Sequence, residues 1–296
     1  MTLRCLNLGC GGHHLAHWVN VDFSSTAAGV IAHNLTAGIP FPEQSFDVVY
    51  HSHVLEHFTR EQGEFFMKEC FRVLKSNGIV RVLVPDLETI ASEYLKNLAG
   101  ALRGDGRDEQ NYDWIVLELL DQTARNAPGG NMAAYWRQPR IGNADYVHQR
   151  MGAEFSNYRK NLQTQQQQQA ERGTPRNAPS LWDRAYLKSA IRRRLLQWLQ
   201  SDEQAAQQLE VGKFRLGGEI HQFMYDRFSL QRLLRRSGFS QIKQVTAATT
   251  ALAGFDDFKW LDLDIETERK TEKEPETDTD TAQARRPDSL FMEGFR

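Results

Sequence analysis

Residues 6–12 read Leu-Asn-Leu-Gly-Cys-Gly-Gly, a short apolar run that ends in a cluster of glycines. Gly9, Gly11 and Gly12 permit a sharp turn and a close approach of a ligand, because glycine adopts backbone angles that a Cβ forbids. A second apolar run ends in Asp22, whose carboxylate can accept hydrogen bonds from two vicinal ribose hydroxyls. The pattern predicts two strands of a parallel α/β sheet with a nucleoside site at their carboxyl ends.

The first third of the chain continues this alternation of strands and helices. Strands are expected at residues 45–50 and 79–84, where β-branched and aromatic residues cluster. Apolar residues at helical spacing predict an amphipathic helix over residues 61–74. Residues 1–86 are therefore interpreted as the first part of a doubly wound sheet domain.

The pattern changes at residue 87. Residues 87–216 are expected to form a large, mainly helical insertion, within which the glutamine-rich and linker-like segment 161–180 is expected to be poorly ordered. The α/β pattern returns over residues 217–296, where Ser229 is placed at the start of a helix. The last strands are expected at residues 241–247 and 289–296.

Composition excludes some classes of protein. Charged residues make up 25% and the formal net charge is −2, so we expect no nucleic-acid partner, which usually requires a basic face. No apolar stretch approaches the roughly 18 residues that cross a bilayer, and a strand near Leu3 leaves no room for a signal peptide. Cys5, Cys10 and Cys70 lack metal-ligand spacing. Reduced cysteines and a cytoplasmic location are expected.

Further motifs follow in a recognisable order. His33-Asn34-Leu35 comes after the second strand, and residues 45–57 read Ser-Phe-Asp-Val-Val-Tyr-His-Ser-His-Val-Leu-Glu-His. Residues 72–79 form the turn before a β-branched strand, and residues 225–239 form a late helix that ends in Ser-Gly-Phe. As a set, these motifs resemble those of class I S-adenosylmethionine-dependent methyltransferases of the type 11 group.

The resemblance implies a Rossmann-like, seven-stranded, mostly parallel sheet flanked by helices. Its last strand would be antiparallel and inserted between the fifth and the sixth. The stretches 218–226 and 286–293 look more narrowly like a bacterial branch of predicted methyltransferases that is associated with sugar or cell-surface polysaccharide modification. The implied function is methyl transfer from S-adenosylmethionine to a sugar, glycan or other small polar acceptor.

The family's cofactor-binding positions carry over onto matching residues. Asn34 stands where aspartate is usual, and its carbonyl can still accept from the adenine amino group. His51 and Ser52 follow the fourth strand, at the edge of an open parallel sheet where ligands bind. Each residue also has a structural interpretation, such as a tight turn, a helix cap or a packed histidine. The predicted cofactor-binding set is Leu8, Gly9, Gly11, Gly12, Asp22, Asn34, Leu35, His51 and Ser52.

A hydroxyl acceptor must lose a proton, which a neutral histidine or a carboxylate can accept. His221 is the first choice for this base, Asp86 at the tip of the fifth strand is the second, and His53 is a third candidate. A structural hydrogen bond is an alternative role for each of them. We expect no metal site, because His51, His53 and His57 lack a carboxylate or cysteine partner at a clear spacing.

Two features of the insertion suggest ligand contacts. Asp121, Gln122 and Arg125 share a helix face that can bind acceptor hydroxyls or be merely solvated. The basic run 184–194 can meet an anionic glycan, a phosphate or a membrane surface, or form a solvated helix face.

Two other functions stay open. A degenerate, non-catalytic cofactor-binding protein of a cell-surface biosynthesis system fits Asn34 and the uncertain base. An NAD-linked epimerase or reductase is disfavoured, because His14 occupies the sixth position of the Gly-x-Gly-x-x-Gly pattern, where a third glycine is needed. The sequence leaves the acceptor, the methylated atom and the oligomeric state undetermined.

Overall fold

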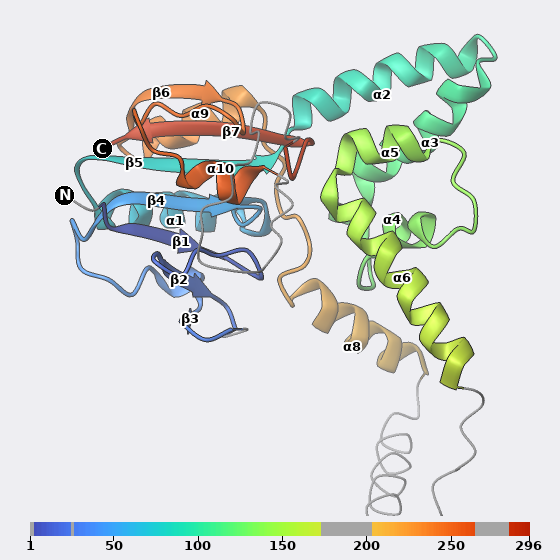
Figure 1. The fold of residues 1–296 in the computed structure, drawn as a ribbon, viewed down its shortest axis with the longest axis horizontal. Helices are drawn as coiled ribbons and strands as arrows, with labels where there is room; N and C mark the ends of the chain where they lie inside the picture. The colour runs from blue at the N-terminus through green and yellow to red at the C-terminus, as the bar shows by residue number, and fades with distance from the viewer. Residues whose placement is uncertain (1–2, 25–26, 173–202, 264–283) are drawn as a thin grey trace, which may run out of the picture.

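A seven-stranded sheet organises the molecule (Figure 1). The computed structural model describes residues 3–24, 27–172, 203–263 and 284–296. The strands, in chain order, are β1 Cys5–Leu8, β2 Val19–Asp22, β3 Val30–Ala32, β4 Phe46–Ser52, β5 Leu74–Pro85, β6 Ser240–Val245 and β7 Ser289–Phe295. They lie side by side in the order β3-β2-β1-β4-β5-β7-β6.

The last strand runs against its neighbours. β7 pairs antiparallel with both β5 and β6, whereas β1 to β5 pair in parallel. Its register with β5 is unbroken from Ile79–Phe295 to Pro85–Ser289. The predicted α/β fold, with an antiparallel last strand between the fifth and the sixth, is confirmed.

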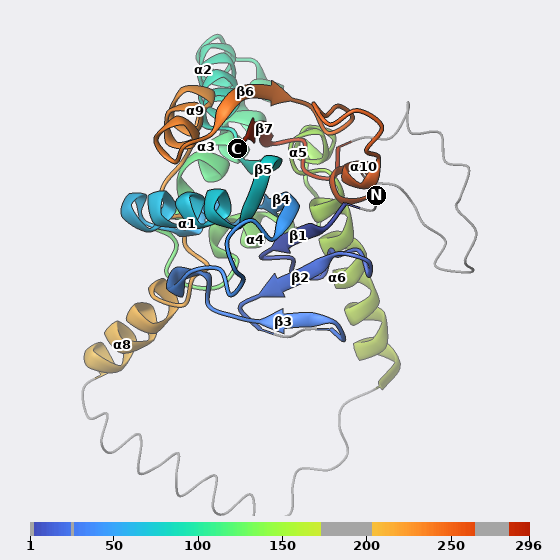
Figure 2. The ribbon, with the colours of Figure 1, turned by 90° about the vertical axis from the view of Figure 1, so that its left-hand side faces the viewer.

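Helices cover both faces of the sheet (Figure 2). Side chains of α1 and α9 pack on one face, and α10 packs on the other with Trp18 of the β1–β2 loop. The α-helices are α1 Arg60–Val73, α2 Leu87–Leu102, α3 Gly106–Ala124, α4 Gly130–Trp136, α5 Ala144–Met151, α6 Ala153–Arg172, α8 Glu203–Arg215, α9 Arg227–Arg236 and α10 Asp257–Asp262. Two 3-10 turns, η1 Leu35–Ala37 and η2 Leu55–His57, follow β3 and β4.

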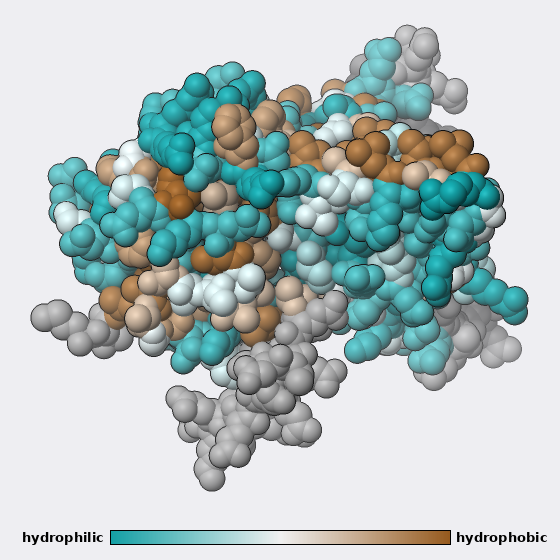
Figure 3. Space-filling model, turned by 90° about the horizontal axis from the view of Figure 1, so that it is seen from above, coloured by the Kyte–Doolittle hydropathy of each residue, from teal (hydrophilic) through white to brown (hydrophobic). Residues whose placement is uncertain are grey.

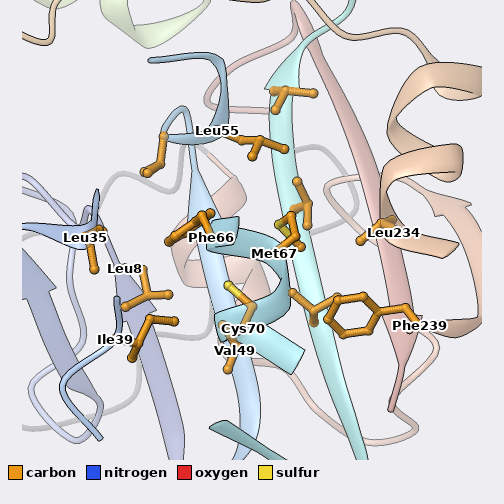
Figure 4. Close-up of a cluster of buried hydrophobic side chains, with 14 of the residues drawn as sticks. Leu8, Leu35, Ile39, Val49, Leu55, Phe66, Met67, Cys70, Leu234 and Phe239 are labelled. Atoms are coloured by element: carbon orange, nitrogen blue, oxygen red, sulfur yellow. The ribbon is translucent and has the colours of Figure 1, made fainter. Parts of the chain in front are cut away.

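Helix α1 shows how the sequence produces the main core (Figure 4). Thr59 and Gln62 form a capping box at its start, which satisfies backbone N–H groups that have no partner within the helix. Phe66, Met67 and Cys70 then fall on one face at helical spacing, and all are at most 1% exposed. This face lies on the sheet and fixes the position of η2, which comes just before it.

Helix α9 begins differently from the prediction. Asp226, not Ser229, is the cap: its side chain accepts from the Ser229 N–H at 2.7 Å, while the Ser229 hydroxyl accepts from the Asp226 N–H at 2.9 Å. Gly238 follows the helix with φ of 104°, as its position predicted. The serine is therefore the third helical residue of a capping box and not its first.

The insertion lies beyond the carboxyl ends of the parallel strands (Figure 1). Its helices share a separate apolar cluster that includes Trp114, Trp136 and Phe155. Residues 161–172 belong to α6, because a polar sequence can continue a helix whose first turns are packed. The poor order expected of the segment 161–180 stays a prediction. The rest of that segment and the basic run 184–194 lie outside the described residues.

The face seen in Figure 3 is mainly hydrophilic, with apolar side chains gathered in places. Leu95 and Leu102 on α2 are 62% and 80% exposed. None of the helices in the described part of the chain combines the length and hydrophobicity of a bilayer-spanning segment.

A buried ionic network joins three elements of the sheet domain. Arg81 on β5 is fully buried; its Nε and Nη2 contact Asp262 Oδ2 at 2.8 and 2.7 Å, and its Nη1 donates to Glu293 Oε1 at 2.6 Å. The carbonyls of Thr246 and Thr249 accept its two remaining N–H groups. All five guanidinium donors are thus satisfied, which is what a buried arginine requires.

We expect Arg81→Leu to reduce the free energy of unfolding by about 3–5 kcal/mol, because it leaves Asp262 and Glu293 buried without a counter-charge. Replacing all three by leucine should recover much of that loss. Chemical denaturation of the purified chain measures both effects.

Lys75→Met is the matched control, because the Lys75–Asp47 pair is partly exposed. Loss of this ion pair should reduce the free energy of unfolding by about 1 kcal/mol or less. An Arg81→Leu variant that lost no more than this control would contradict the role assigned to the network.

Candidate active site

A cavity of about 520 Å³ lies at the carboxyl ends of β1 and β4. This volume is within the usual range for small-molecule sites. Three parts of the chain form its walls: the strand ends, the insertion, and α10 with the segment before β7. The lining includes Asn7, Gly9, Cys10, Gly11, His13, Tyr50, Ser52, His53, Trp136, Glu154, Asn157, Tyr158, Asn161, Asp262, Arg285 and Arg286.

The glycine turn forms one side of this cavity. Gly9 and Gly11 have φ of 66° and 50°, and the Gly9 N–H donates to the Val21 carbonyl at 2.8 Å. A Cβ on Gly9 would lie 2.3 Å from Val54 Cγ2, whereas one on Gly11 or Gly12 would meet no atom within 4 Å. The first glycine is thus needed for packing, and the other two leave open space where a ligand can approach the backbone.

Asp22 holds the turn from the neighbouring strand. Its Oδ2 accepts from the Gly11 N–H at 2.8 Å, and its Oδ1 lies 3.3 Å from the Ser24 N–H. The carboxylate is partly exposed, beside the cavity and not on its wall. The predicted glycine–acid pair therefore does come together in space.

The β1–β2 connection is short. Residues 9–18, all of which the structure describes, contain no α-helix. The buried side chains of Asn7 and Asn20 hold this loop instead, by donating to the carbonyls of His13, Leu15 and Trp18. Sequence reasoning missed both asparagines; a polar residue inside each apolar strand was the available signal.

Asn34 caps η1 and does not face the cavity. Its Oδ1 accepts from the N–H and the hydroxyl of Thr36, at 3.0 and 2.8 Å. Leu35 is buried in the core beside it, and Leu8 is buried at the end of β1. The adenine contact of Asn34 stays a prediction, with an oxygen that already accepts two hydrogen bonds.

The predicted placement of His51 on the cavity wall is wrong. Side chains alternate along β4, so Tyr50 and Ser52 reach the cavity while His51 points to the α1 face. There it is fully buried, with its ring 5.0 Å from that of Phe66, and neither ring nitrogen has a hydrogen-bond partner among the described residues. Burial lowers the pKa of His51 to about 4, although the charge of Glu56 opposes this.

His53 is the predicted base candidate that reaches the cavity. It has φ of 55°, and its Nε2 lies 2.8 Å from Ser289 Oγ. Its Nδ1 lies 3.1 Å from Glu56 Oε1 and 3.2 Å from a guanidinium nitrogen of Arg286. Arg286 also forms an ion pair with Glu154 of α6, which connects this histidine to the insertion.

Glu56 is a fully buried carboxylate behind His53. Burial raises its pKa, but the hydrogen bond and charge of His53, with the charges of His221 and His57, outweigh burial and lower it to about 2. The group is therefore ionised at neutral pH. A buried carboxylate against an imidazole is the arrangement that orients a general base.

The structure does not support the other two base candidates. Asp86 caps α2, where its oxygens accept from the Glu88 N–H at 3.1 Å and the Thr89 hydroxyl at 2.6 Å, and it does not line the cavity. His221 lies behind the cavity wall, with its ring 4.9 Å from that of His57. Burial lowers the pKa of His221 to about 3.

The proposed acceptor face of α3 is internal. Asp121 accepts from the backbone N–H groups of Asn131 and Met132, so it caps α4. Arg125 pairs with Asp121 and with Glu219. Buried charges of this kind are paired for structural reasons. The insertion instead faces the cavity with α4 and α6, which sequence reasoning did not predict.

Comparison with known proteins agrees with this architecture. Residues 6–82 match the type 11 family described as a methyltransferase domain. A probable S-adenosylmethionine-dependent methyltransferase of Mycolicibacterium smegmatis is 39% identical over 61 residues, which cover 21% of this chain and 23% of that relative's length. This matched segment contains less than a quarter of either protein.

Solved structures of S-adenosylmethionine-dependent methyltransferases are more distant. One from Thermotoga maritima is 12% identical with a TM-score of 0.39, over all of this chain and 83% of that one. One from Archaeoglobus fulgidus is 20% identical with a TM-score of 0.26, and the match covers 35% of this chain and 60% of that one. The fold assignment rests on the strand order, since these scores are low.

Residues 6–82, which include the glycine turn and Asp22, thus match a methyltransferase domain. S-adenosylmethionine is the cofactor named for the matched mycobacterial relative.

Replacing the buried His51 should make the protein less sensitive to acid. The unfolded chain protonates this histidine near pH 6.5 and the folded chain only near pH 4, so the unfolded state binds more protons between these values. Stability therefore decreases as the pH is lowered from 6.5 to 4. His51→Leu should remove about 2 kcal/mol of the stability lost between pH 7 and pH 5. Urea denaturation at the two pH values measures this difference.

His148→Leu is the control, because His148 is exposed on α5. It should leave the pH dependence unchanged. If His51→Leu behaved like this control, the buried neutral state assigned to His51 would be incorrect.

Proposed function

We propose that this protein transfers the methyl group of S-adenosylmethionine to a hydroxyl oxygen of a sugar or another small polar acceptor, with His53 as the general base. The observation that carries the proposal is the pairing of His53 with the buried Glu56 at the wall of a cavity that the glycine turn also lines. The three cysteines are free and buried, which supports a cytoplasmic location.

The residues present fit the cofactor. Gly11 and Gly12 leave open space beside the backbone, and the Asp22 carboxylate lies at the adjacent strand end, where it would bind the ribose hydroxyls. The bound cofactor supplies an electrophilic methyl group on a sulfonium, whose leaving group is neutral. The protein has to align the acceptor oxygen in line with that methyl group.

The proton of the acceptor hydroxyl must leave as the carbon–oxygen bond forms. We place the ring proton of His53 on Nδ1, which lies 3.1 Å from Glu56 Oε1, and this leaves the lone pair on Nε2. The acceptor hydroxyl replaces the Ser289 hydroxyl as the hydrogen-bond partner of His53 Nε2 and donates its proton to that nitrogen. The ionised Glu56 then stabilises the imidazolium. The products are a methyl ether and demethylated cofactor, and the proton later passes to solvent.

The insertion supplies the acceptor side of the cavity. Trp136 and Tyr158 present aromatic rings, and the amides of Asn157 and Asn161 supply donors and acceptors. An aromatic surface with a few polar groups suits a small polyhydroxylated molecule. These features support a sugar acceptor, and Arg285 and Arg286 suit one with an anionic group.

Asp22→Ala should weaken binding of S-adenosylhomocysteine, the demethylated cofactor, about 100-fold, because two hydrogen bonds to a charged group are lost. Isothermal titration calorimetry measures this. Glu64→Gln, an exposed carboxylate on α1, is the control and should bind normally. No binding of the demethylated cofactor by the unaltered chain would refute the proposal.

His53→Gln should lower kcat about 100- to 10,000-fold while leaving the affinity for S-adenosylhomocysteine within a few-fold, because a base acts only in the chemical step. Transfer of a tritiated methyl group to a panel of sugars and sugar phosphates measures kcat. His33→Gln, outside the cavity, should retain full activity. Binding of the cofactor without transfer to any of these acceptors would point to the non-catalytic alternative.

A further inference from the structure

A second polar cluster lies behind His53, away from the cavity wall. Its members are Glu56 and His57 of η2 and His221 of the segment that returns from the insertion. We propose that these three residues bind a divalent transition-metal ion. The metal site does not depend on the proposed methyl transfer, although Glu56 belongs to both.

The three side chains place their candidate ligand atoms almost close enough together to bind one ion. One candidate ligand atom from each residue lies within 4.8 Å of the other two, and the rings of His57 and His221 meet edge to face. Ligands at the roughly 2.0–2.1 Å bond lengths of a tetrahedral zinc ion lie about 3.4 Å apart. Closing the cluster around an ion therefore requires shifts of about 1 Å.

Three buried polar atoms in the cluster have no hydrogen-bond partner among the described residues. They are Glu56 Oε1, which lies 3.1 Å from His53 Nδ1 in an ion pair, Glu56 Oε2 and His221 Nδ1. Glu56 is fully buried and His221 is 5% exposed. Burying such atoms without a partner is costly, and a cation between them would remove that cost.

Surrounding hydrogen bonds already hold the ligands in place. His57 Nδ1 lies 3.3 Å from the Ile220 carbonyl, which leaves Nε2 as its ligand atom. The Glu56 carbonyl accepts from the Gln222 N–H at 2.7 Å, and the His221 N–H donates to the Gln122 carbonyl of α3 at 3.1 Å. Supporting contacts of this kind orient histidine ligands in metal sites.

The donor set selects the kind of metal. Two imidazoles and one carboxylate suit Zn²⁺, Fe²⁺, Co²⁺ or Mn²⁺, whereas Mg²⁺ and Ca²⁺ prefer oxygen ligands. Glu56 would use Oε2 for the ion and keep Oε1 on His53. The ion would thus link the segment that contains His221 to η2, and one of its ligands would be Glu56, which pairs with His53.

Cobalt binding tests the site directly. The untagged full chain, freed of metal with a chelator, should bind one Co²⁺ and develop visible absorption typical of nitrogen ligands. His57→Ala and His221→Ala should each weaken Co²⁺ binding at least 100-fold. His17→Ala, an exposed histidine paired with Asp257, should bind Co²⁺ as the unaltered chain does.

X-ray absorption of the Zn²⁺-loaded, unaltered chain gives a result even where a variant fails to fold. Two imidazoles per zinc would support the proposal. A spectrum without imidazole scattering, no Co²⁺ bound at micromolar concentration, or equal binding by His57→Ala and His17→Ala would overturn it. These readouts do not involve methyl transfer, so their failure is distinct from failure of the proposed function.

Discussion

A single buried guanidinium holds the carboxyl-terminal half of the sheet to the wall of the cavity. Arg81 joins β5, β7 through Glu293, and α10 through Asp262, and it also holds the loop after β6. Asp262 in turn accepts a hydrogen bond from the Tyr50 hydroxyl at 2.7 Å, and both residues line the cavity. A charge taken out of water requires every donor and acceptor around it to be paired, so this network favours the observed arrangement of these elements.

The cavity is consequently built from parts that are distant in the chain. The glycine turn and the end of β4 come from the amino-terminal domain segment, whereas Trp136 and Tyr158 come from the insertion. Arg286 connects the two, because its guanidinium contacts both His53 and Glu154. The proposed chemistry depends on this connection, since the base on the sheet and the acceptor side on the insertion must keep one relative position.

Local sequence predicted the fold well, because glycine turns, apolar periodicity and strand-end acids act over a few residues. The Gly11–Asp22 contact follows from such signals, whereas the sheet order was implied by the family resemblance. Individual site residues were harder to predict. Asp86 became a helix cap, and His51 turned to the core because strand side chains alternate between the faces of a sheet. A carboxylate or an imidazole has several structural uses, and its sequence neighbours do not distinguish among them.

The sequence by itself determined the class of fold and the place of the nucleoside turn. Only the tertiary structure decided which histidine faces the cavity, which carboxylate pairs with it, and that Glu56, His57 and His221 meet. The reason is physical: backbone conformation responds to nearby residues, whereas the environment of a buried charge is set by whatever the whole fold packs against it.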